Sequence, residues 1–346
     1  MVFKKNIDKE SYYDFNENHE IYCRPPYYRL YIYYLFFPFY SVINFFILLN
    51  HIRKFDIIWI VTPGASQYAA YLAVKILRKK HFVYIIGNIL GIHTTGILLT
   101  FKKIVAKSEF WANKKISKNA LVYTLGEELY NLYKTNKNRC VKVATNLISE
   151  NDILSFNQLK SLKTAGNKIR LLSLTRLSHE KGLELGIDIA AALLAKGFDV
   201  EYTIVGQGPY ETKIKEYVRQ KLSPGIVKFT GFLKDRNTIY EYYRKSDYFL
   251  LTSFSEGIPK TLLEAQATGV VVLSTKVGGT SDIVEDGKTG FLFSNRDPEV
   301  FAAKIKVLTE NPTQKERIIK SALRHARESC AEQQVKKIID ALADYF

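Results

Sequence analysis

The chain has 346 residues, of which 47% are hydrophobic and 24% are charged, a balance typical of a folded protein and not of a disordered one. This length is generous for one domain and sufficient for two, each with its own core. The formal net charge of +16 favours an anionic partner, such as a nucleoside diphosphate or an acidic membrane surface. No motif typical of nucleic-acid binding accompanies this charge, so we expect no nucleic-acid partner.

The first residues and the cysteines indicate the compartment. Residues 1–10 are polar and lack the apolar core and cleavage site of a signal peptide. The three cysteines, Cys23, Cys140 and Cys330, are far apart in the sequence and lack the spacing of metal ligands. They are typical of free thiols in a reducing compartment, so we expect a cytoplasmic protein without a metal site.

The segment 30–50 is almost free of charge and rich in tyrosine, phenylalanine, isoleucine and leucine. Its length would just cross a bilayer, which takes roughly 20 residues. Pro38, Ser41 and Asn44 interrupt it, and basic residues flank it on both sides, so the positive-inside rule assigns no orientation. Three interpretations remain open: a core helix of an α/β domain, an amphipathic surface helix, and a membrane span, which is the least favoured.

Strands and helices alternate through the rest of the first half. The apolar patterns predict strands at 55–63, 81–86, 120–124 and 140–144, with helices at 68–80, 97–118 and 127–133. This alternation predicts a doubly wound parallel sheet.

A polar stretch at 149–167 interrupts the alternation and is the expected hinge. The pattern restarts with an apolar run at 169–174, which predicts a second Rossmann-like domain. Further helices are expected at 297–309, 313–328 and 331–343. We therefore predict domains at 1–160 and 161–328, followed by a final helix within 329–346.

The segment 255–265 has the clearest functional pattern. It follows a buried apolar run and opens a helix, in which Pro259 suits the first position and Gly269 the end. A helix that begins after a parallel strand presents free N–H groups and its positive dipole end, which suit an anionic ligand. Glu256 and Glu264 flank that position as acceptors for sugar hydroxyls. The combination predicts a nucleotide-sugar site.

Five motifs follow one another in the second half of the chain. They are SLTRL at 173–177 with EKG at 180–182, VGQGP at 205–209, VKFTGF at 227–232, EGIPKTLLE at 256–264, and TKVGG at 275–279 leading to IVEDGKTG at 283–290. In this order they resemble the retaining glycosyltransferases of family 4, also described as group 1, from about residue 168 to about residue 305. The resemblance implies the GT-B fold, in which two Rossmann-like domains face each other across a cleft. It also implies that the last helix crosses back to the first domain.

The resemblance assigns Arg176 and Lys181 to the donor diphosphate, Glu256 to the neighbourhood of the transferred sugar, and Glu264 to the ribose hydroxyls. An arginine fork and a lysine can neutralise a departing diphosphate, so we expect no metal and no other cofactor. Arg176, Lys181 and Glu256 are therefore the predicted catalytic residues. The alternatives are solvated loop cations and, for Glu256, charge compensation at a helix N-terminus of about 0.3–1 kcal/mol.

Further donor-binding candidates come from the same motifs. Gly206 and Gly208 permit close backbone approach, although such a pattern is also typical of a simple turn. Leu233 lies where the family places its base-contacting loop, with core packing as the alternative. The remaining candidates are Gly257, Ile258, Pro259, Lys260, Leu263 and Glu264.

The first half matches the family less closely, because residues 1–20 show neither the usual opening strand nor its glycine-rich loop. Acceptor-side candidates are therefore chosen from the ends of predicted strands. Thr62 and Gly64 lie at the end of the first strand, and Asn88 and His93 follow the second. For His93, an ordinary loop or core histidine is the alternative.

Together these observations predict a retaining hexosyltransferase that moves a sugar from a nucleoside diphosphate to an acceptor hydroxyl. The expected acceptor is a lipid-linked glycan or oligosaccharide of capsule, exopolysaccharide or O-antigen (lipopolysaccharide) biosynthesis, which is analogy with the family. The segments 30–50 and 97–118 would lie on the anionic inner face of the cytoplasmic membrane, making the protein peripheral. The alternatives are a nucleotide-sugar epimerase of the same fold and a non-catalytic, membrane-docked subunit of a glycan assembly complex.

Overall fold

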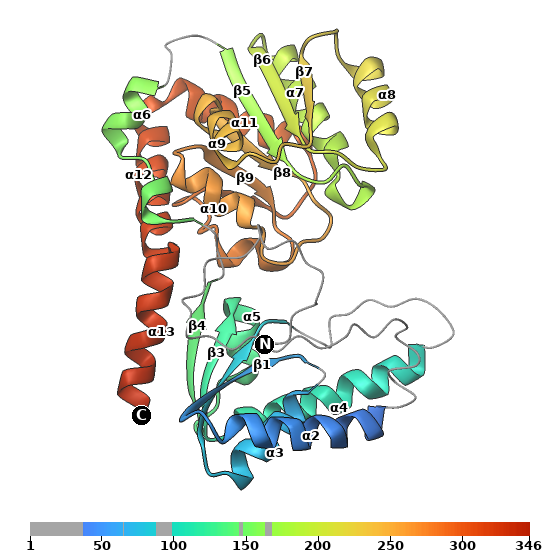
Figure 1. Cartoon of the computed structure of the whole chain (residues 1–346). Coiled ribbons are helices and arrows are strands. Elements are labelled where there is room, and N and C mark those ends of the chain that lie inside the picture. Colours follow the sequence, from blue (N-terminus) through green and yellow to red (C-terminus); the bar gives the residue numbers. More distant parts are fainter. Residues whose placement is uncertain (1–36, 65, 88–98, 145–147, 163–167) are drawn as a thin grey trace.

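The computed structural model describes residues 37–64, 66–87, 99–144, 148–162 and 168–346. The elements form two α/β lobes, and the final helix runs from the upper lobe along the side of the lower one (Figure 1). We call residues 37–144 the N-terminal lobe and residues 148–329 the C-terminal lobe.

The N-terminal lobe has one sheet of four parallel strands that are neighbours in sequence order: β1 (Ile57–Thr62), β2 (Lys80–Ile85), β3 (Leu121–Leu125) and β4 (Arg139–Val143). Its helices are α2 (Phe37–Ile52), α3 (Gln67–Ile76), α4 (Leu99–Ser117) and α5 (Gly126–Tyr133). On one face of the sheet, Ile60, Val83 and Val122 form a core with side chains of these helices. Because side chains alternate along a strand, the other face carries Trp59, Tyr84 and Tyr123.

Helix α2 covers the described part of the segment for which three interpretations were open. One side of this helix contributes to the core of the lobe through Phe45, Leu48 and Ile52. Other apolar side chains of the helix are exposed, namely Val42, Ile43, Phe46 and Ile47. The helix is therefore partly a core helix and partly a surface helix. In the part of the chain that the structure describes, no helix combines the length and hydropathy that a membrane crossing requires.

The C-terminal lobe has a six-stranded parallel sheet in the order β10-β9-β8-β5-β6-β7. The strands are β5 (Lys168–Leu174), β6 (Asp199–Val205), β7 (Val227–Gly231), β8 (Tyr248–Leu251), β9 (Val271–Thr275) and β10 (Phe291–Phe293). The connecting helices are α7 (Leu183–Ala195), α8 (Glu211–Lys221), α9 (Arg236–Lys245), α10 (Lys260–Ala267), α11 (Pro298–Glu310) and α12 (Pro312–Ser329). The strand order reverses between β5 and β8, which makes this point the topological switch of the sheet.

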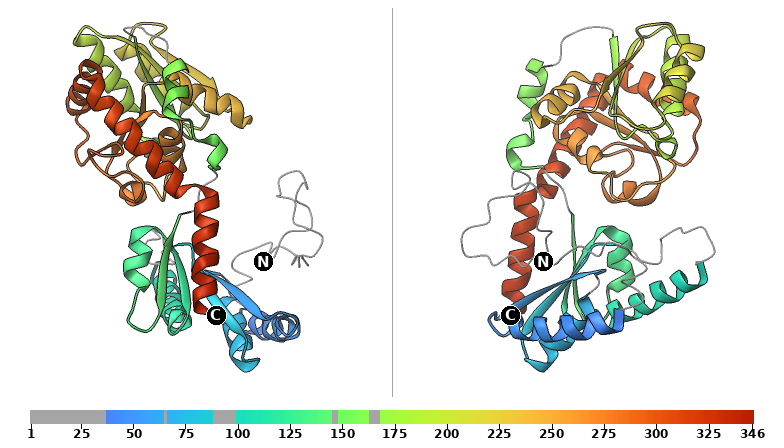
Figure 2. Two further views of the ribbon diagram at one scale, coloured as in Figure 1. Left: turned by 90° about the vertical axis from the view of Figure 1, so that its left-hand side faces the viewer. Right: turned by 45° about the vertical axis from the view of Figure 1, so that its right-hand side comes forward.

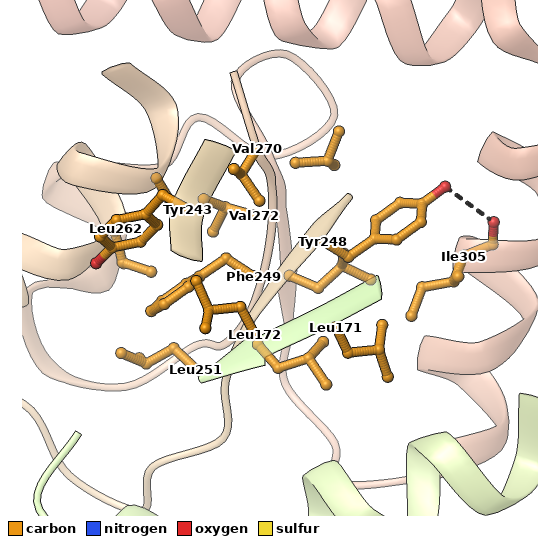
Figure 3. Close-up of a cluster of buried hydrophobic side chains, with 14 of the residues drawn as sticks. Leu171, Leu172, Tyr243, Tyr248, Phe249, Leu251, Leu262, Val270, Val272 and Ile305 are labelled. Atoms are coloured by element: carbon orange, nitrogen blue, oxygen red, sulfur yellow. Dashed lines mark hydrogen bonds between the residues drawn. The ribbon is translucent and has the colours of Figure 1, made fainter. Parts of the chain in front are cut away.

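The centre of this lobe is closely packed around β5 and β8, as Figure 3 shows. Leu171 and Leu172 of β5 are fully buried, and so is Phe249 of β8. The hydroxyl of Tyr248 donates a hydrogen bond to the carbonyl oxygen of Ile305 in α11, at 3.4 Å. Because both strands are fixed by this core, the loops that follow them start from well-defined positions.

The polar stretch 149–167 is not an open hinge over the residues that are described. It contains a short 3₁₀ helix, Glu150–Asp152, and α6 (Phe156–Leu162). Ile153, Leu154 and Leu159 are buried in the core of the C-terminal lobe. The backbone N–H of Leu154 also donates to the carbonyl of Ala267, at 3.0 Å. These few apolar residues, scattered among polar ones, are enough to dock the segment on the lobe.

Helix α13 (Ala331–Tyr345) leaves the C-terminal lobe after α12 and lies along the N-terminal lobe in every view (Figures 1 and 2). The hydroxyl of Tyr123 in β3 donates to the carbonyl of Ile338 at 2.8 Å. Arg139 of β4 forms an ion pair with Asp344 at 3.0 Å. The end of the chain therefore covers β3 and β4 and connects the two lobes.

Candidate functional site

The loops that carry most of the predicted site residues gather at one edge of the C-terminal sheet. All six strands are parallel, so their carboxyl ends lie on the same side. Arg176 and Lys181 follow β5, whereas Glu256 follows β8. The strand order reverses between these two strands, and such a switch point is the usual ligand position in sheets of this kind.

Lys181 and Glu256 meet at this switch point. The ammonium of Lys181 lies 2.8 Å from the Oε1 of Glu256, and the hydroxyl of Ser253 donates to the same oxygen. The side chain of Lys181 is only 21% exposed and that of Glu256 only 10%. Each charge is therefore partly desolvated and depends on its partner. A diphosphate at this position would offer Lys181 a second anion.

Two glycines bring the loop after β6 against the loop after β5. A Cβ at Gly206, whose φ is +138°, would lie 1.9 Å from the carbonyl oxygen of Thr175. A Cβ at Gly208 would lie 2.1 Å from the carbonyl oxygen of Leu177. Only glycine permits these approaches, which support the backbone on both sides of Arg176. The side chain of Arg176 itself is exposed. Contact of the two glycines with the donor stays a prediction.

The loop after β9 is equally close to the loop after β8. A Cβ at Gly278 would lie 1.8 Å from the carbonyl oxygen of Glu256. The N–H of Gly279 donates to the carbonyl of Gly257 at 2.8 Å. These contacts fix the backbone directly before α10.

Helix α10 begins at Lys260, with Pro259 as its N-cap, one residue later than the sequence predicted. Its first-turn N–H groups and positive dipole end follow the loop that carries Glu256, Gly257 and Ile258. Gly269, with φ +69°, lies just beyond the end of the helix, at the predicted stop.

Glu264 belongs to a network that the sequence did not reveal. Its carboxylate accepts a hydrogen bond from the hydroxyl of the buried Tyr243, at 2.9 Å. Burial raises the pKa of Glu264, while the bond from Tyr243 and the charge of Arg236 act in the opposite direction. Arg236 in turn pairs with Asp152 at 2.6 Å. The spacing of Arg236, Tyr240 and Tyr243 on one face of α9 is the sequence signal that could have indicated this network.

Packing accounts for the side chains of two other donor-site candidates. Leu263 is 3% exposed and lies in the core of the lobe. Leu233 is partly buried and packs against that core. Any contact of Leu263 with a ligand would therefore involve its backbone.

Two of the acceptor-side candidates lie on the N-terminal lobe, and the other two lie outside the residues that the structure describes. The side chain of Thr62 is fully buried and cannot reach a ligand directly. The N–H of Gly64 donates to the side chain of Gln67, at 3.0 Å, at the start of α3. Asn88 and His93 lie outside the described residues.

The two lobes touch next to the loops after β8 and β9, a contact that the sequence did not reveal. The N–H of Glu127, in the first turn of α5, donates to the Oδ1 of Asp282 at 3.0 Å. Asp282 thus caps a helix of the opposite lobe, whose own N-cap residue, Leu125, offers no side-chain acceptor. A Cβ at Gly126, whose φ is +76°, would lie 2.4 Å from the Asp282 carboxylate and 3.1 Å from Ile258.

Positive groups suited to a diphosphate come from three predicted residues. Arg176 and Lys181 lie on the loop after β5, and Lys260 begins α10. Within the described ranges, no group of three or more histidine, cysteine, aspartate or glutamate side chains converges as metal ligands would.

Residues 155–325 match the family described as glycosyl transferases group 1. A putative colanic acid biosynthesis glycosyltransferase, WcaL of Salmonella typhimurium, is 32% identical over 179 residues, which are 50% of this chain and 43% of that protein. The amylovoran biosynthesis glycosyltransferase AmsK of Erwinia amylovora is 34% identical over 161 residues, or 45% of this chain and 39% of that protein. The chain thus spans about two fifths of the length of these curated relatives.

The fold is similar over a longer range. The crystal structure of Anabaena Alr3699/HepE in complex with UDP covers 87% of this chain with a TM-score of 0.64 and 18% sequence identity, and 82% of that chain is matched. The predicted GT-B fold is confirmed, with one parallel sheet in each lobe. Residues 155–325 are therefore similar to a glycosyl transferases group 1 domain, and the chain has a GT-B fold.

Proposed function

We propose that the protein is a glycosyltransferase that moves a sugar from a nucleoside diphosphate to an acceptor hydroxyl. The observation that carries this proposal is the contact of Lys181 with Glu256 at the switch point of a group 1 domain. It puts a cation suited to the leaving diphosphate next to an acceptor suited to sugar hydroxyls. The relatives named as glycosyltransferases and the UDP complex of HepE support the same conclusion.

The chemistry follows from where charge develops. When the bond between the anomeric carbon and the diphosphate oxygen breaks, negative charge grows on that oxygen. Arg176, Lys181 and the N-terminus of α10 stabilise this charge without a cofactor. Donor binding draws Lys181 from Glu256 to the diphosphate and frees the carboxylate to accept from the sugar. Glu264, oriented by Tyr243, accepts from the ribose.

We further infer that the anomeric configuration is retained, by resemblance to family 4. In a front-face reaction, the acceptor oxygen forms its bond to the anomeric carbon on the side that the diphosphate leaves. The departing phosphate oxygen takes the acceptor's proton, so no nucleophile from the protein is needed.

The proposed acceptor is a lipid-linked or oligosaccharide precursor of a cell-surface polysaccharide. Two relatives are named for colanic acid and amylovoran biosynthesis, which are the basis for this class. Helices α2 and α3 support a position on the inner face of the cytoplasmic membrane. They expose Val42, Phe46, Leu72 and Ile76, and Lys75, Arg78, Lys79 and Lys80 lie at the end of α3 and the start of β2. Each basic residue near an anionic surface contributes about 1 kcal/mol.

Calorimetry with UDP-, GDP- and ADP-sugars tests the proposal. We expect one nucleotide class to bind, and transfer of its labelled sugar to a membrane extract that contains lipid-linked glycans. Product that remains a free nucleotide sugar would instead indicate an epimerase. Tight binding without transfer or hydrolysis would indicate a non-catalytic subunit. If none of these nucleotides binds, the donor site itself is wrong.

A further inference from the structure

Arg296 lies between β10 and α11, outside all five sequence motifs, yet its guanidinium reaches the site loops. Its Nη1 donates to the carbonyl of Thr252 at 2.6 Å and to that of Ser253 at 3.3 Å. Its Nη2 donates to the carbonyl of Gly182 at 3.4 Å. One side chain therefore joins the end of the loop after β5 to the beginning of the loop after β8.

The same guanidinium also contacts an aromatic ring of the second loop. Its central carbon lies 3.8 Å from the centre of the Phe254 ring. The imidazole of His179, from the first loop, stacks on Phe254 with centroids 5.5 Å apart and an interplanar angle of 13°. A cation over a ring is attracted to its electron-rich face, so Arg296 holds both the backbone and a side chain of this loop.

The backbone leaves room for Arg296 only because residue 182 is glycine. Gly182 has φ +53°, and a Cβ there would lie 2.4 Å from Nη2 of Arg296 and 2.5 Å from the carbonyl oxygen of Thr252. A side chain at this position would push the guanidinium away from the carbonyl that it now contacts. Gly182 and Arg296 are thus fitted to each other.

Two direct bonds complete the connection between the loops. The N–H of Phe254 donates to the carbonyl of Glu180 at 2.8 Å. The hydroxyl of Thr252 donates to the carbonyl of Lys181 at 3.2 Å. The bonded residues lie within four positions of Lys181 or Glu256, so the separation of these two charged groups depends on how firmly the loops are joined.

We propose that Arg296 is a positioning residue for the donor site. Its guanidinium fixes the loop after β5 against the loop after β8, and so holds the backbone segments that carry Lys181 and Glu256 at the separation that the diphosphate and sugar require. This inference rests on the proposed transferase function. A lysine cannot replace Arg296, because a single ammonium lacks the planar fork that reaches carbonyls on two loops while lying over a ring.

The experiment compares Arg296→Lys and Arg296→Ala with Arg219→Ala, which removes the same group from α8, away from these loops. Misplacement of reacting groups by about 1 Å lowers rates by about 100-fold. We therefore expect kcat to fall about 10- to 100-fold in both Arg296 variants and to stay unchanged in Arg219→Ala. Millimolar guanidinium ion should restore part of kcat in Arg296→Ala but not in Lys181→Ala. Wild-type kcat and donor KM in the folded Arg296→Lys protein would overturn the proposal.

A second measurement needs no donor and therefore separates this proposal from the proposed function. Hydrogen exchange of the unliganded protein should become faster in segments 176–182 and 252–257 of both Arg296 variants, and not in Arg219→Ala. Unchanged exchange in these segments overturns the positioning role even if the protein transfers sugar. Faster exchange supports it even if no sugar nucleotide has been found to bind.

Discussion

The two lobes have parallel sheets of the same kind but bury them to different degrees. All residues of β8 and β9 are buried, because helices cover both faces of the C-terminal sheet (Figure 1). In β1 of the N-terminal lobe, Ile57, Trp59 and Val61 are exposed along one face. On that face, helix α13 packs mainly over β3 and β4. The C-terminal lobe is thus built to hold loops in fixed positions, whereas the N-terminal lobe offers apolar surface.

The two lobes also differ in the hydrogen bonding of their buried polar side chains. In the C-terminal lobe, buried polar side chains such as Ser173, Gln266 and Thr275 donate to or accept from neighbours in the lobe. Among the described residues of the N-terminal lobe, the buried hydroxyls of Thr62 and Ser117 have no such partner. Hydrogen-bonded polar side chains make a core more rigid than unpaired ones do. This difference is consistent with the proposed donor chemistry in the C-terminal lobe and with adaptable contacts in the N-terminal lobe.

The strongest test of this difference between the lobes removes the charge of Lys181 from the C-terminal lobe. Lys181→Ala should lower kcat/KM about 100- to 1,000-fold, the range for losing one group that stabilises developing charge. Lys228→Ala is the matched control, because Lys228 of β7 pairs with Glu201 of β6 and its side chain is 57% exposed. Steady-state kinetics with the donor found by calorimetry measures both. Equal activity of the two variants would remove Lys181 from the mechanism.

The contact between the lobes can be broken at Gly126. Gly126→Ala introduces a Cβ 2.4 Å from the Asp282 carboxylate at a positive φ. Gly225→Ala also places an alanine at a positive φ, +90°, but nothing lies within 4 Å of its Cβ. The positive φ costs each variant about 1–2 kcal/mol. Loss of the cap adds about 0.5–2 kcal/mol for Gly126→Ala alone.

Urea denaturation measures this difference as a shift of the transition midpoint. We expect the midpoint of Gly126→Ala to lie below that of Gly225→Ala. Asp282→Ala should show the loss of the cap without the backbone strain. Equal midpoints for the two glycine variants would show that the Asp282 contact does not stabilise the arrangement of the lobes.

In the C-terminal lobe the sequence was sufficient for β5, α10, α11 and α12, because strongly apolar strands and clear helix ends mark them. It placed Lys181 and Glu256 on separate loops, and their contact follows from the strand order. It could not reveal Arg296, Asp282 or Asp152, because each acts through a partner more than 80 residues away. Long-range partners of this kind leave no periodic pattern.

The N-terminal lobe was harder to predict from the sequence, for a different reason. The apolar run of 30–50 fitted three interpretations, since periodicity alone does not tell a core helix from a surface helix. The division of α2 into buried and exposed sides depends on α3, which packs against it. Likewise, the few apolar residues of 149–162 were outweighed by their polar neighbours, although Ile153 and Leu159 are enough to dock the segment.

A substitution on the apolar surface of the N-terminal lobe should have a smaller effect, which concerns membrane binding. Phe46→Ser on α2 should weaken binding to vesicles that contain anionic lipid by roughly 10-fold, because a buried phenylalanine contributes about 1.5–3 kcal/mol and insertion is partial. Val307→Ser is the control, since Val307 is similarly exposed but lies on α11 of the other lobe. Cosedimentation with anionic and neutral vesicles measures both. Identical binding of the two variants would argue against α2 as the membrane contact.

The smallest expected effect concerns the pH dependence of stability through Glu264. Burial raises the pKa of this carboxyl above its usual value of 4.5. A carboxyl with a raised pKa in the folded state favours folding below pH 4.5, and this contribution is lost as the pH rises through the folded-state pKa. Glu264→Gln removes the titration, so its stability relative to the wild type should increase between pH 4.5 and 7. Thermal midpoints across this range measure the trend, with Glu310→Gln on the exposed side of α11 as the control. A wild-type pH profile in Glu264→Gln would mean that the Tyr243 bond and Arg236 fully offset burial, and that the rigid lobe holds this carboxylate charged before any ribose arrives.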